Sequence, residues 1–254
     1  MFFAGSDQLW NYHFASSRFD DFFLTFADPA KRIAISGSFG VEEIPGKWQQ
    51  TYRDGLCGFA HLSVREDAGA RIVKDLTGRD APVLVDPTML LSRDEWLKTA
   101  RKPRVDCTKP YVLKYYLGDE AEEEKIDTWA KENDYEIYEM CNKKNPNLYV
   151  AGPGEFISLI ANADLVCSDS FHCIVFSIIF GKPFVVYSRR GNADYMTSRL
   201  DTLLGKFGFQ ERWKHLLAPE RYLSCDYSRV DTIMAAEREK VMTYIQQALM
   251  KEGN

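Results

Sequence analysis

A histidine stands near the start of an apolar run, directly behind three small polar residues. The segment reads Ser168-Asp169-Ser170-Phe171-His172 and follows a short β-prone run. This order predicts a strand that turns into a helix, with a serine or aspartate side chain capping the helix start, which would also favour an anion. His172 would act there as a general acid or base beside the anion. The alternative is a histidine packed beside an ordinary capped helix.

Arginines follow two other apolar runs and could neutralise such an anion. Arg65 ends one run and precedes Glu66 and Asp67, so it is either a solvated arginine paired with one of these acids or a bidentate clamp on phosphate or carboxylate. Arg189 and Arg190 end the other run, and we expect Arg190 to bind substrate.

Glycine and hydroxyl residues occupy further junctions of this kind. Gly5, Ser6 and Asp7 follow the first apolar run, and together with Ser168, Asp169 and Ser170 they are candidates for binding a small anionic substrate. Gly152-Pro153-Gly154 has neither the spacing of a dinucleotide fingerprint nor that of a P-loop, so neither NAD nor ATP is indicated. The six cysteines form no Cys-x-x-Cys pair and are interpreted as mostly buried thiols, and no metal site is expected.

Strand-like and helix-like runs alternate along the chain and must position these residues. Strands are expected at 32–36, 61–64, 83–85, 111–116, 136–140, 148–150, 165–167 and 183–187, and helices lie between many of them. One of these helices is expected to start at Asp67 and to stop at Gly78. This alternation predicts an α/β fold with parallel, helix-covered sheets, in which ligands bind beyond the carboxyl ends of the strands.

A polar, proline-punctuated stretch at residues 101–104 suggests a domain boundary. We therefore predict a first domain over residues 1–104 and a second over 105–228. Residues 229–254 would form a final helix that could pack against the first domain.

Composition limits the classes of partner. The chain has 254 residues and a net charge of −5, which argues against a broad basic surface for nucleic acid. No apolar run approaches the roughly 20 residues that span a bilayer, and no secretory signal opens the sequence. A cytoplasmic protein without a nucleic-acid partner is the expectation.

Taken in order, the junctions resemble the polysaccharide pyruvyltransferase family. The segments that carry this resemblance run from the first residues to about residue 205 and are Gly5-Ser6-Asp7-Gln8-Leu9-Trp10-Asn11, Ser36-Gly37-Ser38-Phe39-Gly40, Ser63-Val64-Arg65-Glu66-Asp67, Val85-Asp86-Pro87-Thr88, Gly152-Pro153-Gly154-Glu155-Phe156, and Ser168-Asp169-Ser170-Phe171-His172 with the apolar helix behind it.

The resemblance implies a GT-B-like fold, with two Rossmann-like domains facing each other across a cleft. It implies transfer of the enolpyruvyl unit of phosphoenolpyruvate to a pair of sugar hydroxyls, giving a pyruvate ketal on a cell-surface polysaccharide. His172 matches the catalytic histidine of the family and Arg65 an arginine that holds phosphoenolpyruvate, while Arg190 is a looser match. The partners implied are phosphoenolpyruvate and a glycan or lipid-linked sugar, with no further cofactor. A peripheral position at the inner face of the membrane and a homo-oligomer are compatible with this.

The sequence departs from the family pattern in two places. Cys173 stands where a glycine is common, and its larger side chain is expected to narrow the pocket. Family members also carry a further segment before the Gly-Ser-Asp motif, so the N-terminal domain is expected to be incomplete. The opening Met1-Phe2-Phe3-Ala4-Gly5 is then interpreted as a buried internal strand.

Two other functions remain open because a fold does not fix an activity. One is a glycosyltransferase that uses a nucleotide-sugar. The other is a catalytically incompetent fragment or binding module, which would expose an apolar sheet edge near Met1 and self-associate.

Overall fold

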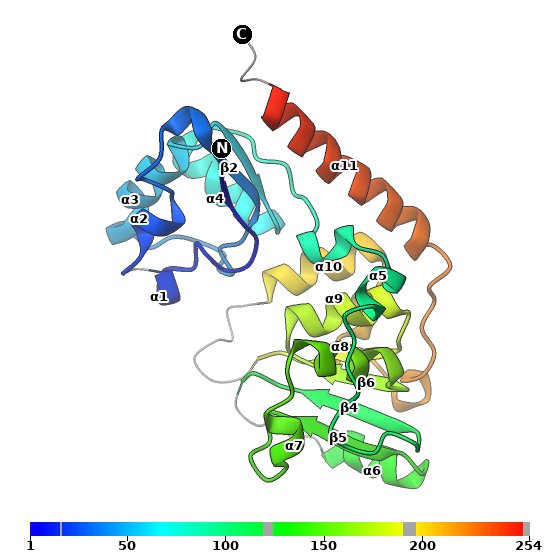
Figure 1. Cartoon of the computed structure of the whole chain (residues 1–254). Helices are drawn as coiled ribbons and strands as arrows, with labels where there is room; N and C mark the ends of the chain where they lie inside the picture. Colours follow the sequence, from blue (N-terminus) through cyan, green and yellow to red (C-terminus); the bar gives the residue numbers. More distant parts are fainter. Residues whose placement is uncertain (16, 119–123, 190–196, 251–254) are drawn as a thin grey trace. The chain divides into compact units, whose positions relative to one another are not determined.

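The computed structural model describes residues 1–15, 17–118, 124–189 and 197–250 (Figure 1). The chain divides into two compact units. Unit 1 consists of Met1–Leu90, Tyr195–Phe207 and Thr232–Asn254, and unit 2 of Leu91–Asp194 and Gly208–Asp231. This division differs from the predicted boundaries in three places, because residues 91–104 and 229–231 belong to unit 2 and residues 195–207 to unit 1.

Unit 1 is built on a parallel sheet with the strand order β1-β2-β3. The strands are β1 (Phe2–Ala4), β2 (Arg32–Gly37) and β3 (His61–Val64). The core beside the sheet centres on the fully buried Trp10, whose ring packs against those of Phe23, Phe39 and Phe59. A side chain at Gly37 would place its Cβ 2.4 Å from Trp10, so this packing requires glycine at the end of β2.

The helices of unit 1 cover this sheet. Those in the described residues are α1 (Tyr12–Ala15), α2 (Phe19–Phe22), α3 (Gly46–Cys57), α4 (Asp67–Thr77), α10 (Ser198–Phe207) and α11 (Val230–Met250) from Thr232 onward, with 3-10 turns at Pro29–Lys31 and Pro87–Leu90. Helix α4 buries Ile72, Val73 and Leu76 at helical spacing, and it ends at Gly78, whose φ of 73° is left-handed. The predicted stop of this helix at Gly78 is confirmed.

The final helix packs on unit 1. The Tyr244 hydroxyl donates to the carbonyl of Ala34 in β2 at 2.7 Å, and Arg238 Nε donates to the carbonyl of Met89 at 2.7 Å. The end of the chain therefore contributes structure to the same unit as its beginning.

Unit 2 is built on a second parallel sheet, with the strand order β5-β4-β6-β7. Its strands are β4 (Tyr111–Tyr115), β5 (Glu136–Met140), β6 (Leu165–Ser168) and β7 (Phe184–Val186). Its helices in the described residues are α5 (Arg93–Leu97), α6 (Glu124–Glu132), α7 (Pro146–Tyr149), α8 (Pro153–Asn162) and α9 (Phe171–Phe180), with 3-10 turns at Gln210–Arg212 and Pro219–Arg221. Both sheets are parallel and connected through helices, so the predicted α/β class is confirmed.

Local structure differs from the sequence predictions in three segments. Residues 146–149 form helix α7 instead of a strand at 148–150, because Asn145 caps the turn and Pro146 suits the first helical position. Around residue 83 only a single bridge, Val64 to Val83, replaces the predicted strand. Strand β1 is a sheet edge, so Phe2 and Phe3 are exposed and only Ala4 is buried.

The cysteines are also less buried than expected. Cys57 and Cys141 are exposed, Cys107 and Cys225 are half-buried, and only Cys167 and Cys173 are buried. Among the described helices none is both long and apolar enough to cross a membrane.

Candidate active-site residues

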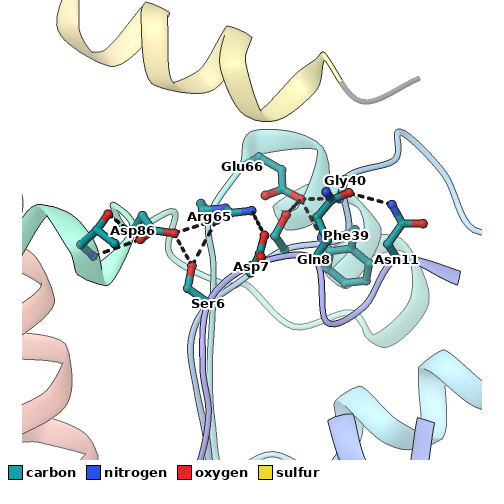
Figure 2. Close-up of polar contacts among 11 residues, drawn as sticks. Ser6, Asp7, Gln8, Asn11, Phe39, Gly40, Arg65, Glu66 and Asp86 are labelled. Carbon is teal, nitrogen blue, oxygen red and sulfur yellow. Dashed lines mark hydrogen bonds and ion pairs between the residues drawn. The ribbon is translucent and has the colours of Figure 1, made fainter. Parts of the chain in front are cut away.

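Arg65 is the centre of a polar cluster at the carboxyl end of the unit 1 sheet (Figure 2). Its side chain is only 1% exposed, and its Nη1 atom lies 2.6 Å from Asp86 Oδ2. Its Nη2 atom lies 3.3 Å from Asp7 Oδ1, and Nη1 also donates to Ser6 Oγ at 3.4 Å. The interpretation of Arg65 as a solvated arginine paired with its sequence neighbours is therefore wrong.

Asp86 joins this cluster from the turn after residue 85. Its Oδ2 atom accepts from Ser6 Oγ at 2.7 Å as well as from Arg65, and its Oδ1 atom accepts from the amide and hydroxyl of Thr88 at 3.0 and 2.8 Å. The carboxylate is buried and receives several donors, so it holds the guanidinium firmly. Sequence reasoning missed Asp86 as a site residue, although its Asp-Pro-Thr turn behind an apolar run was the available signal.

Asp7 is the exposed member of the same cluster. Its side chain is 65% exposed, and its φ of 69° is left-handed, which is unusual for a residue other than glycine. The Asp7 carbonyl accepts from the amide of Ser38 at 3.0 Å, which ties the loop after β1 to the loop after β2. The structure thus brings Ser6, Asp7 and Arg65 together, while Gly5 makes no such contact and faces open space.

Glu66 closes the glycine-containing loop after β2. Its Oε1 atom accepts from Ser38 Oγ at 3.1 Å and from the amides of Phe39 and Gly40 at 2.7 and 3.0 Å. The carboxylate is fully buried, so an internal anion already occupies these amides. The backbone amides of this loop are therefore used within the protein.

In unit 2, the Asp169 carboxylate binds backbone amides of the loop after β4 and does not cap helix α9. Its Oδ1 and Oδ2 atoms accept from the amides of Leu117 and Gly118 at 2.8 and 2.9 Å. Arg189 completes the arrangement, with Nε 3.3 Å from Asp169 Oδ2 and Nη2 3.3 Å from its carbonyl. The cation that the structure places at this sheet edge is Arg189, whereas Arg190 lies outside the described residues.

The two serines of the same junction, Ser168 and Ser170, are buried, and the Ser168 hydroxyl binds the backbone of β4. Ser168 Oγ donates to the carbonyl of Tyr115 and accepts from the amide of Ser170. Ser170 occupies the cap position of α9 but makes no side-chain hydrogen bond to the helix. Ser170 thus stands at the predicted cap position, but the predicted side-chain hydrogen bond is not formed, and the side chains of Ser168 and Asp169 bind a neighbouring strand and loop instead.

His172 lies in the first turn of α9 and is half-buried. Its ring meets the ring of Phe171 edge-on at 5.5 Å. The next residue, Cys173, is fully buried, and this burial raises the pKa of its thiol to about 12. The Cys173 side chain has no exposed surface, so it does not narrow an open pocket as expected from the sequence.

A cavity of 340 Å³ opens at the carboxyl ends of β4 and β5. It is lined by Tyr116, Gly118 and residues 139–144, and the Gly118 amide is one of the groups held by Asp169. Partial burial, with the carboxylates of Asp169 and Glu139, raises the pKa of Cys141 at its wall. No sequence motif marks this loop, in which Cys141 has a left-handed backbone with a φ of 66°.

The two clusters lie in different units, Arg65 in unit 1 and His172 in unit 2. Within the described ranges no group of three His, Cys, Asp or Glu residues is arranged to hold a metal ion. In each unit of this α/β protein, charged and hydroxyl side chains gather at the carboxyl ends of parallel strands, the edge at which open α/β sheets bind ligands.

Residues 1–191 match the sequence model of the polysaccharide pyruvyl transferase family, and the chain belongs to that family. It is accordingly a transferase. Among curated protein sequences, none matches this chain. Among solved structures, a structure of the wall teichoic acid polymerase TagF is similar, with a TM-score of 0.42 and 10% identity over 88% of this chain and 73% of that one.

Proposed function

We propose that this chain transfers the enolpyruvyl unit of phosphoenolpyruvate to two hydroxyls of a sugar and so forms a pyruvate ketal on a polysaccharide. The observation that carries the proposal is the family match, because it spans both junctions with candidate catalytic residues, Arg65 and His172.

The proposed reaction needs one proton donor and a place for two anionic groups. Phosphoenolpyruvate takes a proton at C3, and C2 then acquires oxocarbenium character. One sugar hydroxyl attacks C2 and loses its proton, and the second hydroxyl closes the ketal as the C2–O bond to phosphate breaks. The first hydroxyl proton restores the proton donor, and the second leaves with the phosphate. The products are the ketal and inorganic phosphate, so no oxidant or reductant is required.

His172 is the residue that we assign to proton transfer. It is half-buried in the first turn of α9, where the positive end of the helix dipole favours a bound anion. Imidazole titrates near neutral pH, and acid–base assistance contributes typically about 10²–10⁴-fold to a rate. Arg65 would neutralise the donor, and Arg190 stays a further candidate for binding it.

The experiment is phosphate release from phosphoenolpyruvate by the purified protein, with a panel of cell-surface glycans and lipid-linked sugars as acceptors. We expect release that depends on one class of acceptor. Sugar transfer from a nucleotide-sugar, with no phosphate release from phosphoenolpyruvate, would favour the glycosyltransferase instead. Inactivity with every donor, combined with self-association in sizing experiments, would favour the binding module.

Replacing the imidazole tests the role of His172. His172→Gln should lower the transfer rate by about 10²-fold or more, because the proton donor is lost. His215 is exposed and provides the matched control, so His215→Gln should retain the wild-type rate. Equal rates for the two variants would remove His172 from the mechanism.

A further inference from the structure

We propose that the Asp7 carboxylate holds the place of the donor's anionic group on Arg65, and that donor binding displaces Asp7 while Asp86 keeps the guanidinium in position. This inference rests on the proposed function, since the anion in question is phosphoenolpyruvate. It makes Asp7 a competitor of the substrate and Asp86 a positioning residue.

The two carboxylates hold Arg65 unequally. The Asp86 contact is 2.6 Å between side chains that are 2% and 1% exposed, whereas the Asp7 contact is 3.3 Å and its carboxylate is 65% exposed. Breaking a buried pair leaves an uncompensated buried charge, but an exposed and longer pair contributes little. Asp7 is therefore the partner that yields (Figure 2).

Charge leads to the same conclusion. Two carboxylates share the one guanidinium, so an incoming anion must compete with the carboxylate that Arg65 holds less closely. If Asp7 turns into solvent, Arg65 and Asp86 balance each other and Nη2 can donate to phosphate or carboxylate. Exchange of one anion for another keeps the buried arginine paired throughout.

The backbone allows this exchange to remain local. The left-handed φ of 69° at Asp7 and the hydrogen bond from the Ser38 amide to the Asp7 carbonyl fix the main chain, while the side chain stays exposed. Only side-chain rotation is needed. Asparagine tolerates the left-handed region and has nearly the same shape, so Asp7→Asn removes the charge without straining the loop.

The test is calorimetric binding of phosphoenolpyruvate and, separately, of inorganic phosphate to wild type and Asp7→Asn. The variant should bind both probes about two- to fivefold more tightly, the range expected when an exposed competing ion pair is removed. Asp21→Asn is the matched control, because it also removes one carboxylate from an exposed ion pair in unit 1, with Arg18, and should leave both affinities unchanged. Adding Arg65→Gln to Asp7→Asn should abolish the gain.

Unchanged or weaker binding by Asp7→Asn, or an equal gain in Asp21→Asn, would overturn the inference. Asp7→Gly, which also fits the left-handed backbone, replaces the asparagine variant if that variant does not fold. Failure of the proposed function looks different: wild type would release no phosphate from phosphoenolpyruvate with any acceptor. The comparison of phosphate affinities would still decide the role of Asp7.

Discussion

Arg65 shows how one buried cation organises the carboxyl edge of the unit 1 sheet. Two segments far apart in the sequence meet at its guanidinium, one carrying Ser6 and Asp7 and the other Asp86. A buried arginine is tolerated only when its charge is paired, so the cluster depends most on the buried carboxylate of Asp86.

Replacing Asp86 should therefore destabilise the protein. Asp86→Asn leaves Arg65 buried without its close counter-charge and turns an amide toward existing donors, and it should lower the free energy of unfolding by about 3 kcal/mol. Urea denaturation measures this loss. Asp21→Asn, in an exposed pair, should change the same quantity by less than about 1 kcal/mol. Losses of similar size in the two variants would contradict the positioning role of Asp86.

At this scale the sequence predicted the junctions better than the contacts within them. It placed Arg65 directly behind a strand and His172 at the start of the helix that follows another strand, where the structure also has them. It did not predict that Asp169 would bind the amides of Leu117 and Gly118, because those partners come from a loop about fifty residues away (their separations are 52 and 51). Residue types indicate which groups can donate or accept, but tertiary structure decides which of them meet.

Among the elements, α11 and α10 are joined through one buried carboxylate. The Glu237 side chain is 4% exposed and lies 2.6 Å from Lys206 of α10 and 2.5 Å from Lys240. Burial alone would raise the pKa of Glu237, but the hydrogen bonds and charges of Lys206 and Lys240 outweigh it and lower the pKa below its usual 4.5. The folded state therefore favours the ionised carboxylate.

This arrangement predicts a pH-dependent contribution to stability. Glu237→Gln should lower the free energy of unfolding by about 1–3 kcal/mol at neutral pH, the range for hydrogen bonds to charged groups. A group with a depressed folded-state pKa stabilises above its unfolded value, so the difference from wild type should shrink as pH falls below 4.5. Urea titrations at several pH values measure it. A difference independent of pH, or an equal loss in Glu239→Gln on the same helix, would contradict this account.

Elements were predicted well where a long apolar pattern was present. The continuous apolar run of residues 171–180 correctly predicted helix α9, and Gly78 correctly predicted the end of α4. The failure at 148–150 shows the limit, because three apolar residues fit either state and the cap at Asn145 decided for a helix.

For the whole molecule, the alternation of strands and helices was enough to predict the α/β class. It could not predict how the chain is shared between the units. The chain leaves unit 1 after Leu90, returns for Tyr195–Phe207 and returns again at Thr232. Helix α10 is joined to α4 through Thr202, whose hydroxyl accepts from the Asp67 amide at 3.1 Å. An amphipathic helix can pack on any hydrophobic core, so the apolar pattern of α10 does not predict which unit it belongs to.

The central claim concerns the whole protein and is tested most directly by following carbon. Phosphoenolpyruvate labelled at C2 would be incubated with the wild-type protein and the acceptor found in the phosphate-release screen, and the product examined by carbon NMR. We predict a labelled ketal carbon on the glycan, formed in equal amount with phosphate and absent with His172→Gln. Labelled phosphoenolpyruvate that stays intact, or that yields only free pyruvate while the glycan remains unlabelled, would contradict the account.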